Sequence, residues 1–104
     1  MAQVLTDRRD IDFVLYEQFD VEEFTRHEKF QDFNKKTFVL IIKEARNLSV
    51  KEILPTYAGG YREGFNFASG RVSFPAFYHR PYKLLREGVW TAMIADPDLG
   101  GQGL

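Results

Sequence analysis

The fold of this chain is decided by its longest amphipathic stretch, Phe33-Asn-Lys-Lys-Thr-Phe-Val-Leu-Ile-Ile-Lys-Glu-Ala-Arg-Asn-Leu-Ser-Val-Lys-Glu-Ile-Leu54. Its apolar residues recur at the three- and four-residue spacing of one helix face, and most of its charged residues fall off that face. The apolar positions include Phe38, Ile41, Ile42, Ala45 and Leu48. Pro55 follows directly, and a residue that precedes proline is disfavoured in helical conformation. The pattern predicts a long helix over residues 33–54 that ends at Pro55.

Two short helical segments are predicted ahead of this helix, after nine residues that we expect to form a flexible lead-in. The run Asp10–Phe19 has helical spacing, and Asp10 or Asp12 is suited to cap its start. Because the run is short, a strand is the alternative there. Asp20 is expected to cap one further helical turn, with Glu23 at the capping-box position.

The region after Pro55 is predicted to hold a long loop and one further helix. Residues 56–70 carry four glycines between aromatic residues, which favours a loop, and residues 71–75 are expected to be extended. Proline is tolerated in the first turn of a helix but not deeper. We therefore place the helix start near Pro81, with Phe77–Arg80 as a turn leading in and Gly88 as the end. Residues 89–95 are interpreted as a buried apolar segment, followed by loop.

These elements predict an all-α fold in two parts. Residues 1–32 are expected to form an N-terminal extension with short helices, and residues 33–104 a helical domain. That domain is predicted to be incomplete, because the loop Gly100-Gly-Gln-Gly103 at its end leads toward no further element. We expect the chain to be the opening part of something larger.

The composition excludes several classes of function. A formal net charge of −1 with no basic patch argues against nucleic-acid binding. The absence of cysteine excludes disulfides, thiolate metal sites and a cysteine nucleophile. No apolar run approaches the ~18–20 residues of a membrane span, and the N-terminus has no apolar core of a signal peptide. A cytoplasmic location is the default expectation.

The residues that usually carry chemistry do not compose an active site. His27 and His79 are far apart in the sequence, so two surface histidines are favoured over a metal site. Paired carboxylates can perform acid–base work, but Glu22-Glu23 fits the first turn of a helix and Asp96-Pro97-Asp98 fits a turn. The sequence predicts no catalytic and no metal-binding residue.

Two glycine- and aromatic-rich segments leave alternatives open. The loop Gly100–Gly103 could cradle a phosphate through its backbone N–H groups, but no lysine follows it, and a tight connection into a next helix is favoured. The segment Tyr57–Phe67 could stack a ligand ring, although packing of its aromatic residues on one another is favoured.

Read in order, three blocks resemble the N-terminal region of acyl-CoA dehydrogenases, in the subgroup with an extra N-terminal segment that includes the 3-methylmercaptopropionyl-CoA dehydrogenases. The first block is Asp10-Ile-Asp-Phe-Val-Leu-Tyr-Glu17, and the second is the helix that ends Glu52-Ile-Leu-Pro55. The third and most specific is Gly88-Val-Trp90 with Ala95-Asp-Pro-Asp-Leu-Gly-Gly-Gln-Gly-Leu104. The chain departs from the family at Ala58-Gly59-Gly60, where the family has an aspartate, at Val89, which splits its Gly-Trp pair, and at Pro81.

The resemblance implies part of a flavoenzyme that removes two hydrogens from the α and β carbons of an acyl-CoA. In that family FAD accepts the hydride and an electron-transfer flavoprotein reoxidises it. The catalytic glutamate and most flavin contacts belong to the middle and C-terminal domains, so no catalytic or cofactor-binding residue is expected in this chain. Its predicted partners are the rest of the dehydrogenase and, as a homo-oligomer, further subunits. The extension, Asp10 to about Phe30, is expected to lie against one of these.

The only residues that the resemblance places near the substrate pocket are Gly100, Gly101, Gln102 and Gly103, as part of its wall. Two other functions stay open at this point. One is a stand-alone helical interaction module derived from the same domain, which the high aromatic content of 15% favours. The other is a small ligand-binding domain that uses the Tyr57–Phe67 segment.

Overall fold

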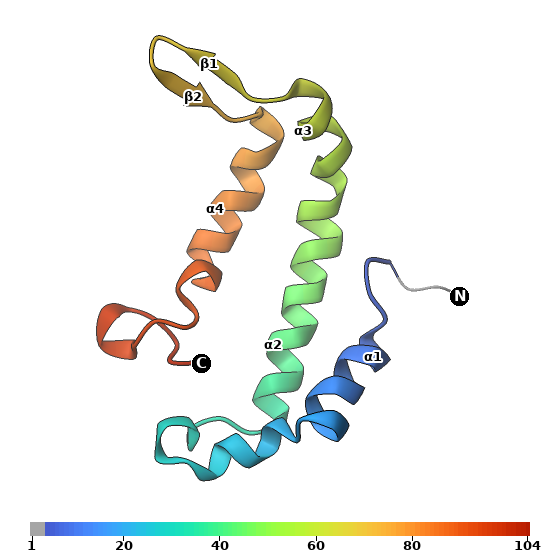
Figure 1. The fold of residues 1–104 in the computed structure, drawn as a ribbon, viewed down its shortest axis with the longest axis vertical. Coiled ribbons are helices and arrows are strands. Elements are labelled where there is room, and N and C mark those ends of the chain that lie inside the picture. Colours follow the sequence, from blue (N-terminus) through green and yellow to red (C-terminus); the bar gives the residue numbers. More distant parts are fainter. Residues whose placement is uncertain (1–3) are drawn as a thin grey trace. The chain divides into compact units, whose positions relative to one another are not determined.

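The computed structural model describes residues 4–104, which are mostly helical and divide into two compact units (Figure 1). Unit 1 ends at Ala45 and unit 2 comprises Arg46–Leu104. The elements are α1 (Arg8–Asp12), α2 (Lys35–Leu48), α3 (Tyr57–Glu63), α4 (His79–Glu87) and a two-stranded sheet of β1 (Asn66–Ala68) and β2 (Arg71–Ser73). The helical class is confirmed, with the small sheet as an addition that the sequence did not predict.

The first helix of unit 1 begins earlier than predicted. Helix α1 starts at Arg8 and passes directly into a π-helical turn, Phe13–Gln18, so the helical interpretation of this run is confirmed over its strand alternative. The expected caps Asp10 and Asp12 are wrong: the Asp7 carboxylate accepts the Arg9 N–H at 2.8 Å. Asp7 takes this role because its extended backbone turns its side chain toward the open end of the helix. Residues 1–3 of the expected lead-in lie outside the described residues.

The segment between α1 and α2 consists of two 3-10 turns, Val21–Arg26 and Glu28–Phe30. The predicted helical turn after Asp20 is therefore confirmed, but the predicted cap is wrong. Asp20 has a positive φ of 45°, and its side chain makes no capping hydrogen bond. In this left-handed conformation its backbone, rather than its carboxylate, sets the start of the turn.

Helix α2 carries the buried side chain of Phe38, whose ring stacks on Phe33 with centroids 6.0 Å apart. The helix begins at Lys35 because the Asn34 side-chain oxygen accepts the Thr37 N–H at 3.0 Å. The predicted start at Phe33 is thus two residues early.

The predicted helix end at Pro55 is wrong. Helical conformation continues through a π-helical turn, Ser49–Ile53, and a 3-10 turn, Leu54–Thr56, into α3. Leu54 keeps helical backbone angles, φ −53° and ψ −44°, although it precedes proline. Pro55 sits in the first positions of the 3-10 turn, where its missing N–H is tolerated.

The predicted loop over residues 56–70 is replaced by α3 and strand β1. Gly59 and Gly60 lie inside α3 and are buried against the 3-10 turn Ala76–Tyr78. A side-chain carbon on Gly59 would lie 2.7 Å from the Phe77 ring, and one on Gly60 would overlap the Tyr78 ring. These glycines therefore serve close packing and not chain flexibility.

The sheet of unit 2 is a tight antiparallel hairpin, drawn in yellow between α3 and α4 in Figure 1. Its register pairs Asn66 with Ser73, Phe67 with Val72 and Ala68 with Arg71. Ser69 and Gly70 form the turn, with φ values of 52° and 73°, and two successive positive values fit the twist of a two-residue hairpin. The predicted extended conformation of residues 71–75 is confirmed for β2.

Helix α4 begins at His79, two residues before the predicted start, so that Pro81 falls in its first turn. Its end at Gly88 is as predicted. The helix packs on the π-helical turn Ser49–Ile53, where the Arg80 Nε donates to Glu52 Oε2 at 2.9 Å. The prediction that residues 89–95 are buried is wrong: none of them is fully buried, and the Ile94 side chain is 85% exposed.

Candidate functional site

The glycine loop, Gly100–Gly103, follows a 3-10 turn over Pro97–Leu99. The predicted turn at Asp96 is confirmed: its carboxylate accepts the Asp98 N–H at 3.1 Å. This bond to the Asp98 N–H starts the turn, so the Asp96 carboxylate has a structural role here.

The N–H groups of the glycine loop are already used within the chain. They donate to carbonyl groups of the preceding segment: Gly100 to Pro97 at 3.0 Å, Gly101 to Asp96 at 3.1 Å, Gln102 to Met93 at 3.3 Å and Gly103 to Ala95 at 2.9 Å. A phosphate cradle needs such N–H groups to be open and convergent. The phosphate alternative is therefore wrong for this conformation, and the loop is a tight connection that folds back on residues 93–97.

The backbone conformation explains why each of the three loop positions is occupied by glycine. Gly100 and Gly103 have φ values of 87° and 67°, which side-chain-bearing residues rarely adopt. A side-chain carbon on Gly101 would overlap the Ala95 carbonyl group. The sequence pattern of this loop thus encodes one compact conformation. Whether it walls a substrate pocket stays a prediction.

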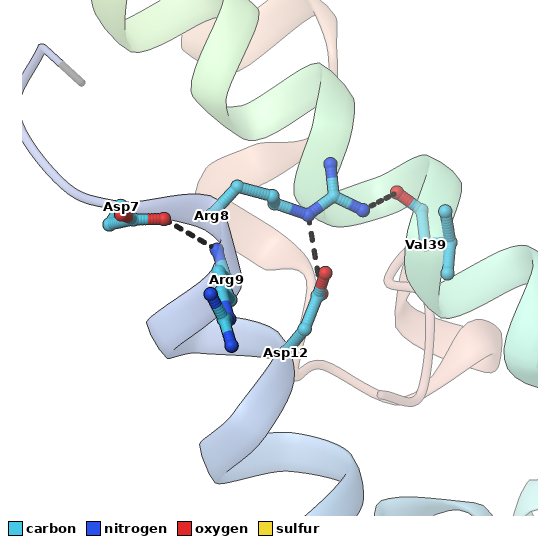
Figure 2. A network of polar contacts seen from close by, with 5 residues as sticks. All are labelled: Asp7, Arg8, Arg9, Asp12 and Val39. Carbon is cyan, nitrogen blue, oxygen red and sulfur yellow. Dashed lines mark hydrogen bonds and ion pairs between the residues drawn. The ribbon is translucent and has the colours of Figure 1, made fainter. Parts of the chain in front are cut away.

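A polar network joins α1 to α2 in unit 1 (Figure 2). The Arg8 guanidinium donates from Nε to Asp12 Oδ1 at 3.2 Å and from a terminal nitrogen to the Val39 carbonyl oxygen at 3.4 Å. Figure 2 shows the Arg8 side chain reaching from α1 toward Val39, with Asp12 below it. One guanidinium therefore links its own helix to a residue far along the chain.

A hollow of about 370 Å³ lies beside this network. Its walls combine two cations, two carboxylates, two aromatic rings and one valine: Arg9, Lys35, Asp12, Glu17, Phe13, Tyr16 and Val39. The Lys35 ammonium sits 4.8 Å from the Tyr16 ring centroid. The sequence did not predict this hollow, because its two sides come from segments that show no shared local pattern.

Tyr16 contributes a buried hydroxyl group to the hollow. Its hydroxyl oxygen is buried and has no hydrogen-bond partner among residues 4–104. Burial raises the pKa of this hydroxyl, and the nearby Asp12 carboxylate raises it further against the opposing effect of Arg8. Tyr16 is consequently protonated at neutral pH and is not suited to act as a base.

The histidines and the Glu22–Glu23 pair that the sequence analysis considered do not form a site. His27 and His79 are both exposed, in agreement with their interpretation as surface residues. Glu22 and Glu23 occupy the first turn of Val21–Arg26, as predicted, and Glu23 lies 3.7 Å from Arg26. Within residues 4–104, no three His, Asp or Glu side chains gather closely enough to hold a metal ion.

The hairpin of unit 2 presents an aromatic face, which we define as Phe65, Phe67, Val72 and Phe74. Side chains alternate along a strand, so the pairing of Phe67 with Val72 puts these two on one side and Asn66 with Ser73 on the other. Phe65 and Phe74 lie two residues beyond Phe67 and Val72, and their rings meet edge to face with centroids 5.4 Å apart. All four side chains are between 56% and 71% exposed. A contiguous exposed apolar surface of this kind is typical of an interaction site.

Comparisons of the chain with protein-family models, with curated proteins and with solved structures each found no match. In the part of the chain that the structure describes, no helix combines the length and the apolar character needed to cross a bilayer. The three candidate sites are therefore judged by their geometry alone. They are the glycine loop, the hollow of unit 1 and the aromatic face.

Proposed function

We propose that this chain is the N-terminal helical part of an FAD-dependent acyl-CoA dehydrogenase and is not catalytic by itself. The observation that carries the proposal is the conformation of the glycine loop. The block that resembles the family most specifically, Asp96 to Leu104, forms one compact turn in which each of its three glycines meets a backbone requirement. The mostly helical fold agrees with the proposed domain.

The glycine loop does not fit a CoA phosphate. Its N–H groups donate to internal carbonyl groups. We therefore assign the cofactor, the acyl-CoA and the reacting groups to other domains of the enzyme. Its proposed partners are the electron-transfer flavoprotein and further subunits of the enzyme. Its proposed location is the cytoplasm.

The role proposed for the chain is to close one side of the acyl pocket. Ile94 and Leu99, on either side of the Asp96 turn, are 85% and 81% exposed. Covering these side chains with another domain would remove apolar surface from water and keep water from the pocket. The glycine loop would hold both residues in place, because its hydrogen bonds tie the end of the segment to its beginning.

The proposal is tested by sequencing the reading frame past codon 104 and expressing everything that it encodes. We expect a yellow protein that retains FAD and reduces an electron acceptor with an acyl-CoA, while residues 1–104 alone are colourless and inactive. Gly101→Ala in the full protein should lower acyl-CoA turnover, and the control Tyr61→Ala, at a side chain that is 80% exposed and outside the loop, should leave it close to wild type. A full product that is colourless and inert with every acyl-CoA overturns the proposal.

A second candidate, a stand-alone interaction module, is favoured by the exposed aromatic face. Its four side chains remain open to water, and the hairpin connects α3 to α4 in the sequence. A stop codon directly after codon 104, together with a stable fold of residues 1–104, would support this function over the dehydrogenase.

A further inference from the structure

The hollow of unit 1 lies between two helical faces. Five of its residues recur at spacings of three and four along α1 and the π-helical turn that follows it, and therefore share one face: Arg9, Asp12, Phe13, Tyr16 and Glu17. Lys35 and Val39, one turn apart on α2, form the opposite side. All of these residues belong to unit 1. The volume of about 370 Å³ falls within the range of roughly 300–1,000 Å³ that small-molecule sites occupy.

The charges that line this hollow are not balanced within the described chain. The Asp12 carboxylate is paired with Arg8 at 3.2 Å, and every side-chain donor with a dashed contact in Figure 2 belongs to Arg8. In the described chain, Arg9, Glu17 and Lys35 form no ion pair. Two unpaired cations against one unpaired carboxylate leave an excess of one positive charge, which favours an anion as the ligand.

The hollow also contains a hydrogen-bond donor that lacks an acceptor. The Tyr16 hydroxyl is buried, and no acceptor in the described chain satisfies it, which costs stability. The Lys35 ammonium lies 4.8 Å from the centroid of the same ring. Because the Lys35 side chain is exposed and flexible, it can swing aside and open the hydroxyl. An oxygen anion between the two groups would then accept from the hydroxyl and pair with the ammonium.

We propose that the hollow of unit 1 binds a small monocarboxylate with an aromatic body. The carboxylate lies between the Lys35 ammonium and the Tyr16 hydroxyl, which are its direct partners. Its aromatic ring lies on Phe13, whose side chain is 56% exposed. Arg9, on the same face one helical turn before Phe13, attracts the anion into the hollow. This site goes beyond the proposed dehydrogenase function and does not rest on it.

Glu17 restricts the charge of the ligand. Its carboxylate lines the hollow and directly follows Tyr16 in the sequence, so it repels a second negative charge. A dicarboxylate or a phosphate monoester is therefore disfavoured against a monocarboxylate. Removal of the Glu17 charge should strengthen the binding of an anion, which is a result that loss of the fold would not produce.

The first experiment titrates the ¹⁵N-labelled chain with 3-phenylpropionate from about 0.1 to 20 mM and follows the amide chemical shifts by NMR. A ligand of about eleven non-hydrogen atoms in an open hollow should bind with Kd on the order of 1 mM. The shifts should saturate and be largest in α1, in the turn that follows it and at the start of α2. The uncharged 3-phenylpropanamide should bind at least about fivefold more weakly, and binding of the carboxylate should weaken as salt is raised.

The second experiment compares matched variants in the same titration. Lys35→Gln should weaken the binding of 3-phenylpropionate about tenfold. Lys36→Gln removes the same charge from the exposed neighbour that does not line the hollow, and it should leave binding unchanged. Glu17→Gln should strengthen binding about threefold. Tyr16→Phe should weaken it about fivefold although loss of the unsatisfied hydroxyl favours the fold, so unfolding cannot account for the weaker binding.

Three outcomes would overturn the proposal. The absence of saturable shifts with 3-phenylpropionate up to about 20 mM excludes the site, and so does equal binding by Lys35→Gln and wild type. The amine 3-phenylpropylamine is titrated in parallel, because the Glu17 carboxylate and the aromatic rings also suit a cation. Tighter binding of this amine than of the carboxylate, with loss of the amine binding in Glu17→Gln, assigns the hollow to organic cations instead.

Discussion

Unit 1 and unit 2 hold their segments together by opposite means. In unit 1 a long side chain spans the space between helices: Arg8 on α1 reaches the Val39 carbonyl of α2 (Figure 2). In unit 2 the segments pack directly against each other, because Gly59 and Gly60 of α3 let the rings of Phe77 and Tyr78 approach the helix backbone. The two arrangements place different demands on the sequence.

The difference predicts where each unit tolerates change. A flexible, partly exposed arginine can be replaced at modest cost, since solvent takes over part of its role. A glycine that meets another backbone or a packed ring has no such substitute, because an added carbon must displace what it meets. We therefore expect the largest effects at glycines of unit 2 and smaller effects at polar residues of both units.

The largest effect is expected for Gly101→Ala. The added carbon would overlap the Ala95 carbonyl group, which is backbone and cannot rotate away. Because the substitution should cost about 2–3 kcal/mol, amide exchange at Gln102 and Gly103 should become roughly 30- to 160-fold faster. Hydrogen exchange followed by NMR measures this, with Gln102→Ala as the control. Unchanged exchange in Gly101→Ala would show that the loop is not closed as described.

Gly60→Ala tests the packing inside α3 through the sign of its effect. Alanine in place of glycine stabilises a helix interior by about 1 kcal/mol. Contact with the Tyr78 ring should cost about 1–3 kcal/mol, so we expect a net loss of about 1 kcal/mol in the free energy of unfolding. Urea denaturation measures it, and Tyr61→Ala, at a side chain that is 80% exposed, is the control. A gain in stability would contradict the close contact.

Arg8→Met tests the link of unit 1 while keeping the apolar stem. The substitution removes the Asp12 ion pair and the bond to Val39, and the Arg8 side chain is only 25% exposed. We expect the free energy of unfolding to fall by about 0.5–1 kcal/mol. The neighbouring Arg9→Met should change it by less. Equal effects of both variants would argue against a specific role of Arg8.

Tyr16→Phe should increase stability slightly. It removes a buried hydroxyl that has no hydrogen-bond partner in the described chain, so we expect a gain of a few tenths to about 1 kcal/mol. Because burial raises the Tyr16 pKa above its ordinary value of 10.0, the folded state is favoured below that pH and loses this advantage as the pH rises through the raised pKa. The variant should therefore lose less stability above pH 10 than wild type, as measured by urea denaturation across pH. A variant with the same alkaline loss would exclude Tyr16 as its source.

The smallest effect is expected for Glu52→Gln in unit 2. The hydrogen bond from Arg80 lowers the pKa of Glu52 below its ordinary value of 4.5. Its contribution is present above that pH and is lost as the pH falls through the lowered pKa. The variant should show a shallower loss of helical circular dichroism on acidification, and the exposed Glu63→Gln should behave like wild type. A steeper acid transition in Glu52→Gln would contradict the assignment.

The hairpin shows which sequence signals were missed. Alternation in Phe65-Asn-Phe-Ala68 and Arg71-Val-Ser-Phe74 around a Ser-Gly pair is a hairpin signature. The four glycines of residues 56–70 were instead interpreted together as loop. Two of them, Gly59 and Gly60, lie inside α3 and face the rings of Phe77 and Tyr78. A third, Gly70, forms the hairpin turn with a φ of 73°. Glycine count alone could not separate close packing from chain reversal.

The candidate sites also differ in whether the sequence could predict them. The turn at Asp96 was predictable because its hydrogen bond joins residues two apart. The hollow beside Tyr16 was not, since Lys35 and Val39 come from a different segment than Phe13 and Tyr16. No pattern within either segment indicates that they meet.

Local chemistry alone accounts for the helical character of the chain, the end of α4 at Gly88 and the turn at Asp96, because spacing and short-range hydrogen bonds act over a few residues. Contacts between distant residues were needed to place Gly59 and Gly60 against aromatic rings and to bring the Arg8 side chain of α1 to the Val39 carbonyl of α2. The physical reason is that a residue's own preference is worth about a kilocalorie per mole, and packing against a distant partner can match or exceed that amount.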